Sequence, residues 1–95
     1  MTQTEAKQQL TILFTEFLKE TDLDKLKSKK DQILKFYNAL PFSESSSVGQ
    51  KMESNLLSDT INIYINNISD KSVKLLLAGD FDRILISVSV SLLED

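Results

Sequence analysis

Two pairs of carboxylates, Asp22 with Asp24 and Asp80 with Asp82, have the residue types that could hold a hard metal ion. A calcium loop needs several oxygen ligands around a turn, a glycine inside that turn and a glutamate after it. Neither pair continues in this way, and Gly79 precedes Asp80 instead of following it. We interpret both pairs as helix caps or first-turn acids, which the positive end of the helix dipole favours. We therefore expect no metal site.

The composition leaves few groups for nucleophilic or redox catalysis. The 95-residue chain has no histidine and no cysteine, which removes imidazole bases, thiolates, disulfides and sulfur-bound metals. Lysine could still activate a serine, but Ser28 and Lys29 are sequence neighbours, which point to different faces of a helix. Gly49 and Gly79 are the two glycines and form no phosphate-binding loop. We expect a protein that is not an enzyme and carries no cofactor.

The charge distribution bears on the choice of partner. The chain has 11 basic and 14 acidic residues, a net charge of −3, and residues 48–95 alone carry four basic and seven acidic residues. Nucleic-acid binding needs clustered Lys and Arg, so we expect no nucleic-acid partner. Five lysines between Lys25 and Lys35 form the one basic cluster, diluted by Asp31. We interpret it as a solvated helix face, with peripheral contact to acidic lipid headgroups as the alternative.

Hydrophobic periodicity predicts two helices in the first half of the chain. Apolar residues recur at i, i+3 and i+4 over about 4–20, where Thr2 and Glu5 have the spacing of a capping box. A second stripe runs over about 21–40 and ends at Pro41. Because almost nothing separates the two helices, we expect an antiparallel hairpin. The predicted core-facing residues are Ala6, Leu10, Leu13, Phe14, Phe17, Leu18, Leu23, Leu26, Ile33, Leu34, Phe36, Tyr37 and Leu40.

A loop and a long helix are predicted next. Four of the seven residues over 41–47 are serine, which suits turns and helix N-caps. A third helix is expected over about 48–68. Its predicted core stripe is Leu57, Ile61, Tyr64, Ile65 and Ile68.

Turn-forming residues divide the remainder. Ser69 or Asp70 is expected to cap a short helix, which Gly79 ends as a left-handed C′ residue. Asp80 is then expected to cap a final helix over 81–93. The predicted core stripe of that helix is Phe81, Ile84, Leu85, Val88 and Leu92.

The predicted fold class is all-α: a compact bundle of four main helices and one short helix in a single domain, residues 1–95. The alternative is α+β, because residues 60–66 and 83–91 alternate with period two and are rich in β-branched side chains. Two strands alone do not form a stable sheet, and no third strand is predicted. The all-α interpretation is therefore preferred.

The third and last predicted helices carry more apolar surface than one core face needs. On a helical wheel the extra residues of the third helix fall in an arc of about 80°, well separated from its core stripe. A second stripe of this kind is either covered within the chain or available to a partner. We take seven residues as candidate protein-binding positions: Val48, Met52, Leu56, Ile63, Ile86, Val90 and Leu93.

The function we expect is non-catalytic protein binding by a small adaptor, inhibitor or assembly subunit with a regulatory role. It would act through these second faces and associate with itself as a homodimer. The alternative is a carrier in which the second faces line a cavity for a small apolar ligand or lipid. The longest uncharged apolar run, residues 84–93, is too short to span a bilayer, and we expect a cytoplasmic location.

In size, acidity and helical profile the sequence also resembles the small helical-bundle bacteriocin-immunity proteins. The resemblance implies a self-protection function. No motif carries it, so no residue of this chain takes a role from it.

Overall fold

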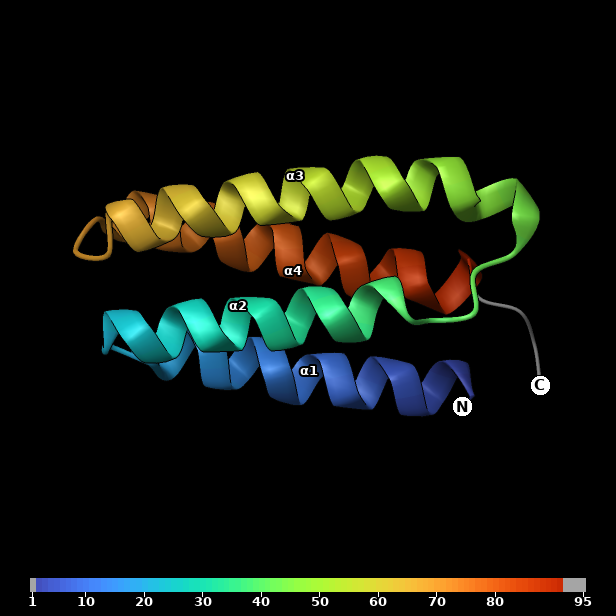
Figure 1. The fold of residues 1–95 in the computed structure, drawn as a ribbon, viewed down its shortest axis with the longest axis horizontal. Coiled ribbons are helices and arrows are strands. Elements are labelled where there is room, and N and C mark those ends of the chain that lie inside the picture. The colour runs from blue at the N-terminus through green and yellow to red at the C-terminus, as the bar shows by residue number, and fades with distance from the viewer. Residues whose placement is uncertain (1, 92–95) are drawn as a thin grey trace.

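The structure, a computed structural model, describes the backbone of residues 2–91 and the side chains of residues 2–89. This part of the chain forms four long helices and no strands (Figure 1). A short 3-10 helix, Glu44–Ser46, precedes the third of them. The long helices are α1, Gln3–Lys19; α2, Leu23–Asn38; α3, Ser47–Asn66; and α4, Lys71–Ser91.

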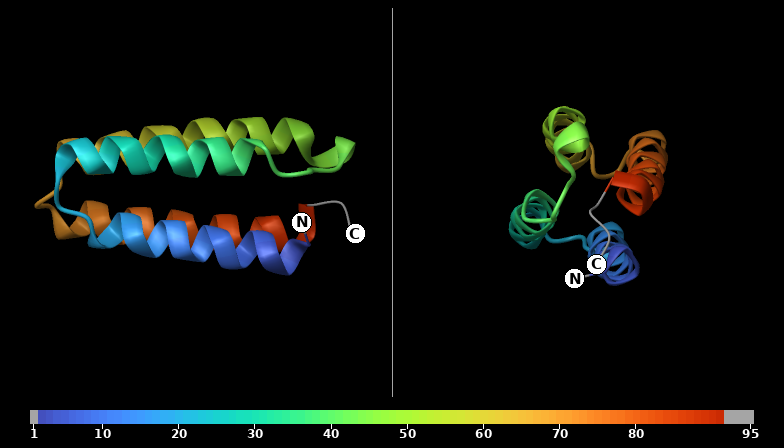
Figure 2. Two further views of the ribbon diagram at one scale, coloured as in Figure 1. Left: turned by 60° about the horizontal axis from the view of Figure 1, so that its bottom comes forward. Right: turned by 90° about the vertical axis from the view of Figure 1, so that its right-hand side faces the viewer.

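The helices pack as an antiparallel bundle in which each runs opposite to the one before it (Figure 2). The neighbouring pairs around the bundle are α1–α2, α2–α3, α3–α4 and α4–α1, so the last helix closes against the first. The bundle measures 40 × 21 × 19 Å. A helix of about 20 residues spans about 30 Å of this length at about 1.5 Å rise per residue. The predicted all-α bundle and the hairpin of the first two helices are confirmed.

Side-chain caps start three of the helices where the sequence predicts them. The Thr2 hydroxyl accepts from the Glu5 N–H at 3.0 Å, and Glu5 Oε1 accepts from the Thr2 N–H at 3.3 Å. The carboxylates of Asp22 and Asp70 accept first-turn N–H groups of α2 and α4 at 3.0 and 2.9 Å. Because caps are contacts between near neighbours in sequence, they are predictable without knowledge of the tertiary fold.

Aromatic rings from three helices meet in the core. The Phe14 and Phe81 rings stack at a centroid distance of 4.0 Å, and Phe17 meets Phe81 edge-on at 6.0 Å and Tyr64 at 5.6 Å. The buried hydrophobic residues are Ala6, Leu10, Phe14, Phe17, Leu26, Ile33, Tyr37, Leu40, Leu57, Ile61, Tyr64, Leu77, Phe81, Ile84 and Val88.

Of the predicted core residues that the structure describes, Leu23 is exposed, and Leu92 lies outside the described residues. Leu23 is the first residue of α2. Side chains on a helix tilt toward its N-terminus, so that of Leu23 points past the packed part of the bundle. The prediction for this residue was wrong.

The predicted break at Gly79 is also wrong, because α4 continues through it and no described residue has a positive φ. Instead of capping a new helix, Asp80 lies within α4 and pairs with Arg83. The buried stripe continues across the glycine from Leu77 to Phe81. Glycine costs a helix about 1 kcal/mol, whereas each large apolar side chain buried gains about 1.5–3 kcal/mol. Burial therefore decides the outcome.

The two period-two stretches, residues 60–66 and 83–91, are helical. In α3 the buried Ile61 is followed two residues later by the exposed Ile63, and in α4 the buried Ile84 is followed by the exposed Ile86. Side chains that would share one face of a strand are thus divided between core and solvent. The α+β alternative does not describe this part of the chain, because helix packing overrides local β propensity.

Candidate functional site

The predicted protein-binding residues that the structure describes are exposed. Their exposed fractions lie between 48% and 71% for five residues: Val48, Met52, Leu56, Ile63 and Ile86. The side chain of Val90, and Leu93 as a whole, lie outside the described residues. For the five described residues the covered alternative does not hold: the chain folds and still leaves their apolar surface open.

These residues gather on the outward side of α3 and α4, which lie side by side. Leu56 and Ile63 are seven residues apart and so lie on one strip of α3. A hydrogen bond between Glu53 and Ser87 marks the register of the two helices. Ile63 follows Glu53 by ten residues on α3, and Leu77 precedes Ser87 by ten residues on the antiparallel α4. Ile63 and Leu77 therefore lie at the same level along the bundle. Leu76, the neighbour of Leu77, is also exposed and therefore extends the strip onto α4.

We call this set the α3–α4 apolar surface. It consists of Val48, Met52, Leu56, Ile63, Leu76 and Ile86.

Sequence reasoning missed Leu76, and it missed Leu75 and Ile12, which are also exposed. The signal was present in the run of three leucines over 75–77. Consecutive helical residues are about 100° apart, so the three cannot all enter one core stripe. Leu77 enters the core and the other two do not. The run was predicted to lie in a separate short helix, in which its exposed residues do not continue the second face of a longer helix.

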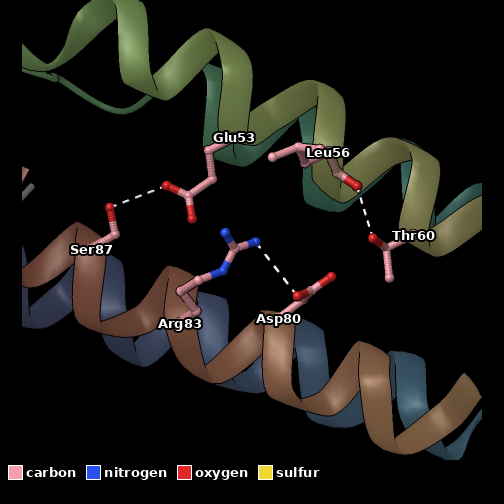
Figure 3. A network of polar contacts seen from close by, with 6 residues as sticks. All are labelled: Glu53, Leu56, Thr60, Asp80, Arg83 and Ser87. Atoms are coloured by element: carbon pink, nitrogen blue, oxygen red, sulfur yellow. Dashed lines mark hydrogen bonds and ion pairs between the residues drawn. The ribbon is translucent and has the colours of Figure 1, made fainter. Parts of the chain in front are cut away.

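A polar network joins α3 to α4 beside this surface (Figure 3). The Ser87 hydroxyl donates to Glu53 Oε2 at 3.2 Å, and Arg83 Nη2 lies 3.5 Å from Asp80 Oδ1. In Figure 3 the Arg83 side chain reaches from α4 toward α3 and ends between Glu53 and Asp80. Thr60 donates to a main-chain carbonyl of its own helix at 3.0 Å. Arg83 lies seven residues after Leu76 and so on the same strip of α4, which places charged groups within the α3–α4 apolar surface as well as beside it.

A pocket of about 240 Å³ opens at the end of the bundle where the α2–α3 loop lies. Tyr37 is 1% exposed and its ring meets that of Phe42 edge-on at a centroid distance of 5.3 Å. Burial, together with the negative charge of Glu53, raises the pKa of Tyr37, while Arg83 acts in the opposite direction. The hydroxyl therefore stays protonated at neutral pH. The lining residues are Tyr37, Phe42, Ser45, Ser46, Gly49, Gln50, Glu53 and Ser87.

The lysine cluster lies on α2. Lys29 Nζ is 3.9 Å from Glu16 of α1, and Lys30 Nζ donates to Asn62 Oδ1 of α3 at 2.7 Å. The other three lysines of the cluster are exposed. Two of the five are thus used in contacts between helices, as expected for a helix face that is structural and solvated.

One member of each carboxylate pair makes a structural contact. Asp22 caps α2 and Asp80 pairs with Arg83. Among the described residues no three His, Cys, Asp or Glu side chains are grouped so that they could hold a metal ion. In the same part of the chain, no helix combines the length and apolar character needed to cross a membrane.

Comparison of the chain with protein-family models, with curated proteins and with solved structures gave no match. Two features of the described structure remain for a functional interpretation: the α3–α4 apolar surface and the polar pocket at the loop end of the bundle.

Proposed function

We propose that this chain is a non-catalytic protein-binding module that pairs with a second copy of itself through the α3–α4 apolar surface. One observation carries the proposal: the second apolar faces predicted from sequence are open to solvent on two adjacent helices. Large exposed patches of contiguous apolar surface mark interaction sites in folded proteins. Covering such a patch stabilises a complex by about 25 cal/mol per Å² of apolar area, less the cost of association.

The dimensions of the bundle suit such an interface. Its broad side measures 40 × 21 Å, which is roughly the 800 Å² that one partner contributes to an interface of standard size. Two adjacent helices can thus supply a whole interface without help from loops.

The charges within and beside the surface favour a second copy as the partner. Lys51 and Asp59 lie exposed on α3, and Asp82 and Arg83 lie exposed on α4. A two-fold symmetric interface sets the same patch against itself, so each charge can meet one of opposite sign. A partner of strongly acidic or basic character would instead call for a surface of one sign.

The exposure of the second faces supports surface docking over the carrier alternative. A carrier would use these side chains to line an internal cavity, whereas the five described ones face solvent. The self-protection function implied by the resemblance to bacteriocin-immunity proteins stays a prediction, because a helical bundle alone does not carry a function.

Sedimentation velocity of the purified chain tests the proposal. A concentration-dependent shift toward twice the chain mass of 10.8 kDa is expected. A single species of 10.8 kDa at every concentration up to the millimolar range would contradict self-pairing. Capture of a different protein by such a monomer would then assign the surface to that partner instead.

A further inference from the structure

The pocket at the loop end of the bundle brings together a carboxylate, a buried hydroxyl and two aromatic rings from separate parts of the chain. We propose that it binds a primary alkylammonium group, with Glu53 as the counter-ion and the Tyr37 hydroxyl as a second acceptor. This site is distinct from the α3–α4 apolar surface and does not depend on self-pairing.

Glu53 is a partly buried carboxylate that forms no ion pair with a described residue, although the Arg83 guanidinium ends near it. Its Oε2 accepts from Ser87 at 3.2 Å, but the ion pairs of the described residues do not include it. Arg83, the nearest candidate in Figure 3, pairs with Asp80 instead. A carboxylate removed in part from water favours a cation beside it.

Tyr37 supplies the second observation. It is 99% buried and lines the pocket, yet its hydroxyl forms no hydrogen bond to any described residue. No buried side-chain oxygen or nitrogen of the described residues lacks a hydrogen-bond partner, so this hydroxyl is not an orphaned core atom but opens into the space of the pocket. The phenol oxygen is therefore available to a ligand that enters the pocket.

The remaining lining groups can accept hydrogen bonds as well as donate them. The Gln50 amide nitrogen donates to Asn38 Oδ1 at 2.9 Å, and its amide oxygen can accept. No Lys or Arg lines the pocket, and residues 48–95 carry four basic against seven acidic residues. An ammonium group has three donors and no acceptor, so its chemistry complements this lining, whereas that of an anion does not.

The volume of the pocket limits the size of the alkyl stem that carries the ammonium group. Its volume of about 240 Å³ exceeds the roughly 150 Å³ of a protein cavity that accepts benzene. A stem of about four carbons therefore fits, and the rings of Tyr37 and Phe42 offer it an apolar wall and the cation a π-face. This chemistry has two sources: a free small amine, and the four-carbon side chain of a lysine on another protein.

Titration of the ¹⁵N-labelled full chain with n-butylammonium chloride at pH 7, followed by amide chemical shifts, tests the proposal. Saturable shifts are expected for residues 45–53, which contain most of the lining. Sodium butyrate at the same ionic strength should not change the chemical shifts of these amides. Equal shifts with butyrate, or no saturable shift with butylammonium, would overturn the proposal.

Two near-isosteric variants identify the groups that bind. Glu53→Gln should weaken butylammonium binding about tenfold, and Tyr37→Phe by about three- to tenfold, since each removes one partner of a charged donor. Glu44→Gln is the matched control, because it removes the same charge from the neighbouring 3-10 helix outside the lining. Unchanged binding by a folded Glu53→Gln variant, or an equal loss in Glu44→Gln, would contradict the assignment.

A second titration separates the two sources of the ammonium group. Nα-acetyl-lysine N-methylamide carries the same headgroup and stem on a peptide-like end. Tighter binding than butylammonium assigns the pocket to a protein lysine, and weaker binding assigns it to a free amine. Since neither readout involves the mass of the particle, the pocket and the self-pairing proposal succeed or fail separately.

Discussion

At the scale of single residues, Leu56 and Leu57 show how the helix divides one sequence between two environments. They are adjacent and identical in type, but Leu56 is 51% exposed and Leu57 is fully buried. The surface position is a candidate for binding and the core position a determinant of stability. A pair of matched substitutions separates the two roles.

Leu57→Ala should lower the free energy of unfolding by about 2–5 kcal/mol, because it removes buried methyl groups and leaves a cavity. Leu56→Ala should change it by less than about 1 kcal/mol in dilute solution, where the side chain is largely in water. Urea denaturation followed by circular dichroism measures both. Similar losses in the two variants would contradict the burial assigned to them.

The buried Tyr37 makes the free energy of unfolding depend on pH in the alkaline range. Burial raises the pKa of this group in the folded chain, whereas in the unfolded chain it titrates near 10. The unfolded state therefore loses the Tyr37 proton at a lower pH than the folded state. The free energy of unfolding is unaffected by this group below about pH 10 and falls as the pH rises above it. The urea midpoint should drop more steeply above pH 10 in the natural sequence than in Tyr37→Phe. Parallel pH profiles for the two proteins would contradict the burial of the hydroxyl.

At the scale of elements, α4 continues through Gly79 because its apolar stripe is buried on both sides of that residue. Gly79 lies inside it with a helical backbone, and a Cβ added there would meet no atom within 4 Å. Gly79→Ala should therefore stabilise the chain by about 0.5–1 kcal/mol, the usual gain at an unstrained helical position. A thermal melt measures the change. A loss of stability would instead favour the break that the sequence predicted.

The elements also show what the sequence could and could not predict. Thr2, Asp22 and Asp70 were among the predicted cap candidates, each with a neighbouring alternative, because a cap contacts a backbone group at most three residues away. The exposed second faces followed from helical periodicity alone. The contact of Glu53 with Ser87 spans 34 residues, so the register of α3 on α4 depends on packing that no local pattern contains.

The pocket was missed for the same reason. Tyr37 was predicted as a core residue because its spacing fits the stripe of α2, and it is buried. That its hydroxyl opens toward Glu53 depends on how α2, the loop and α3 meet. A tyrosine in a core stripe is a signal that its polar end needs a destination, but the sequence does not say which.

At the scale of the whole molecule, the bundle distributes its surface unevenly. Residues 1–47 carry seven lysines and seven acidic residues, whereas most of the large exposed hydrophobic residues lie on α3 and α4. One side of the bundle is thus well suited to water, and the opposite side gains from being covered. This asymmetry is the physical basis for the proposed pairing of two copies.

Ile86→Lys should weaken the pairing, because it places a charge twice, once from each copy, in a symmetric interface. The matched control is Ile12→Lys, the same exchange at an exposed position on α1, outside the α3–α4 apolar surface. Both variants should fold like the natural sequence, since both side chains are exposed.

Sedimentation velocity of these two variants beside the natural chain tests the central claim most directly. The account predicts a dimer for the natural sequence and for Ile12→Lys, and a shift of at least tenfold in the dissociation constant toward monomer for Ile86→Lys. Equal dissociation constants for the two variants, or weaker pairing in Ile12→Lys than in Ile86→Lys, would contradict it.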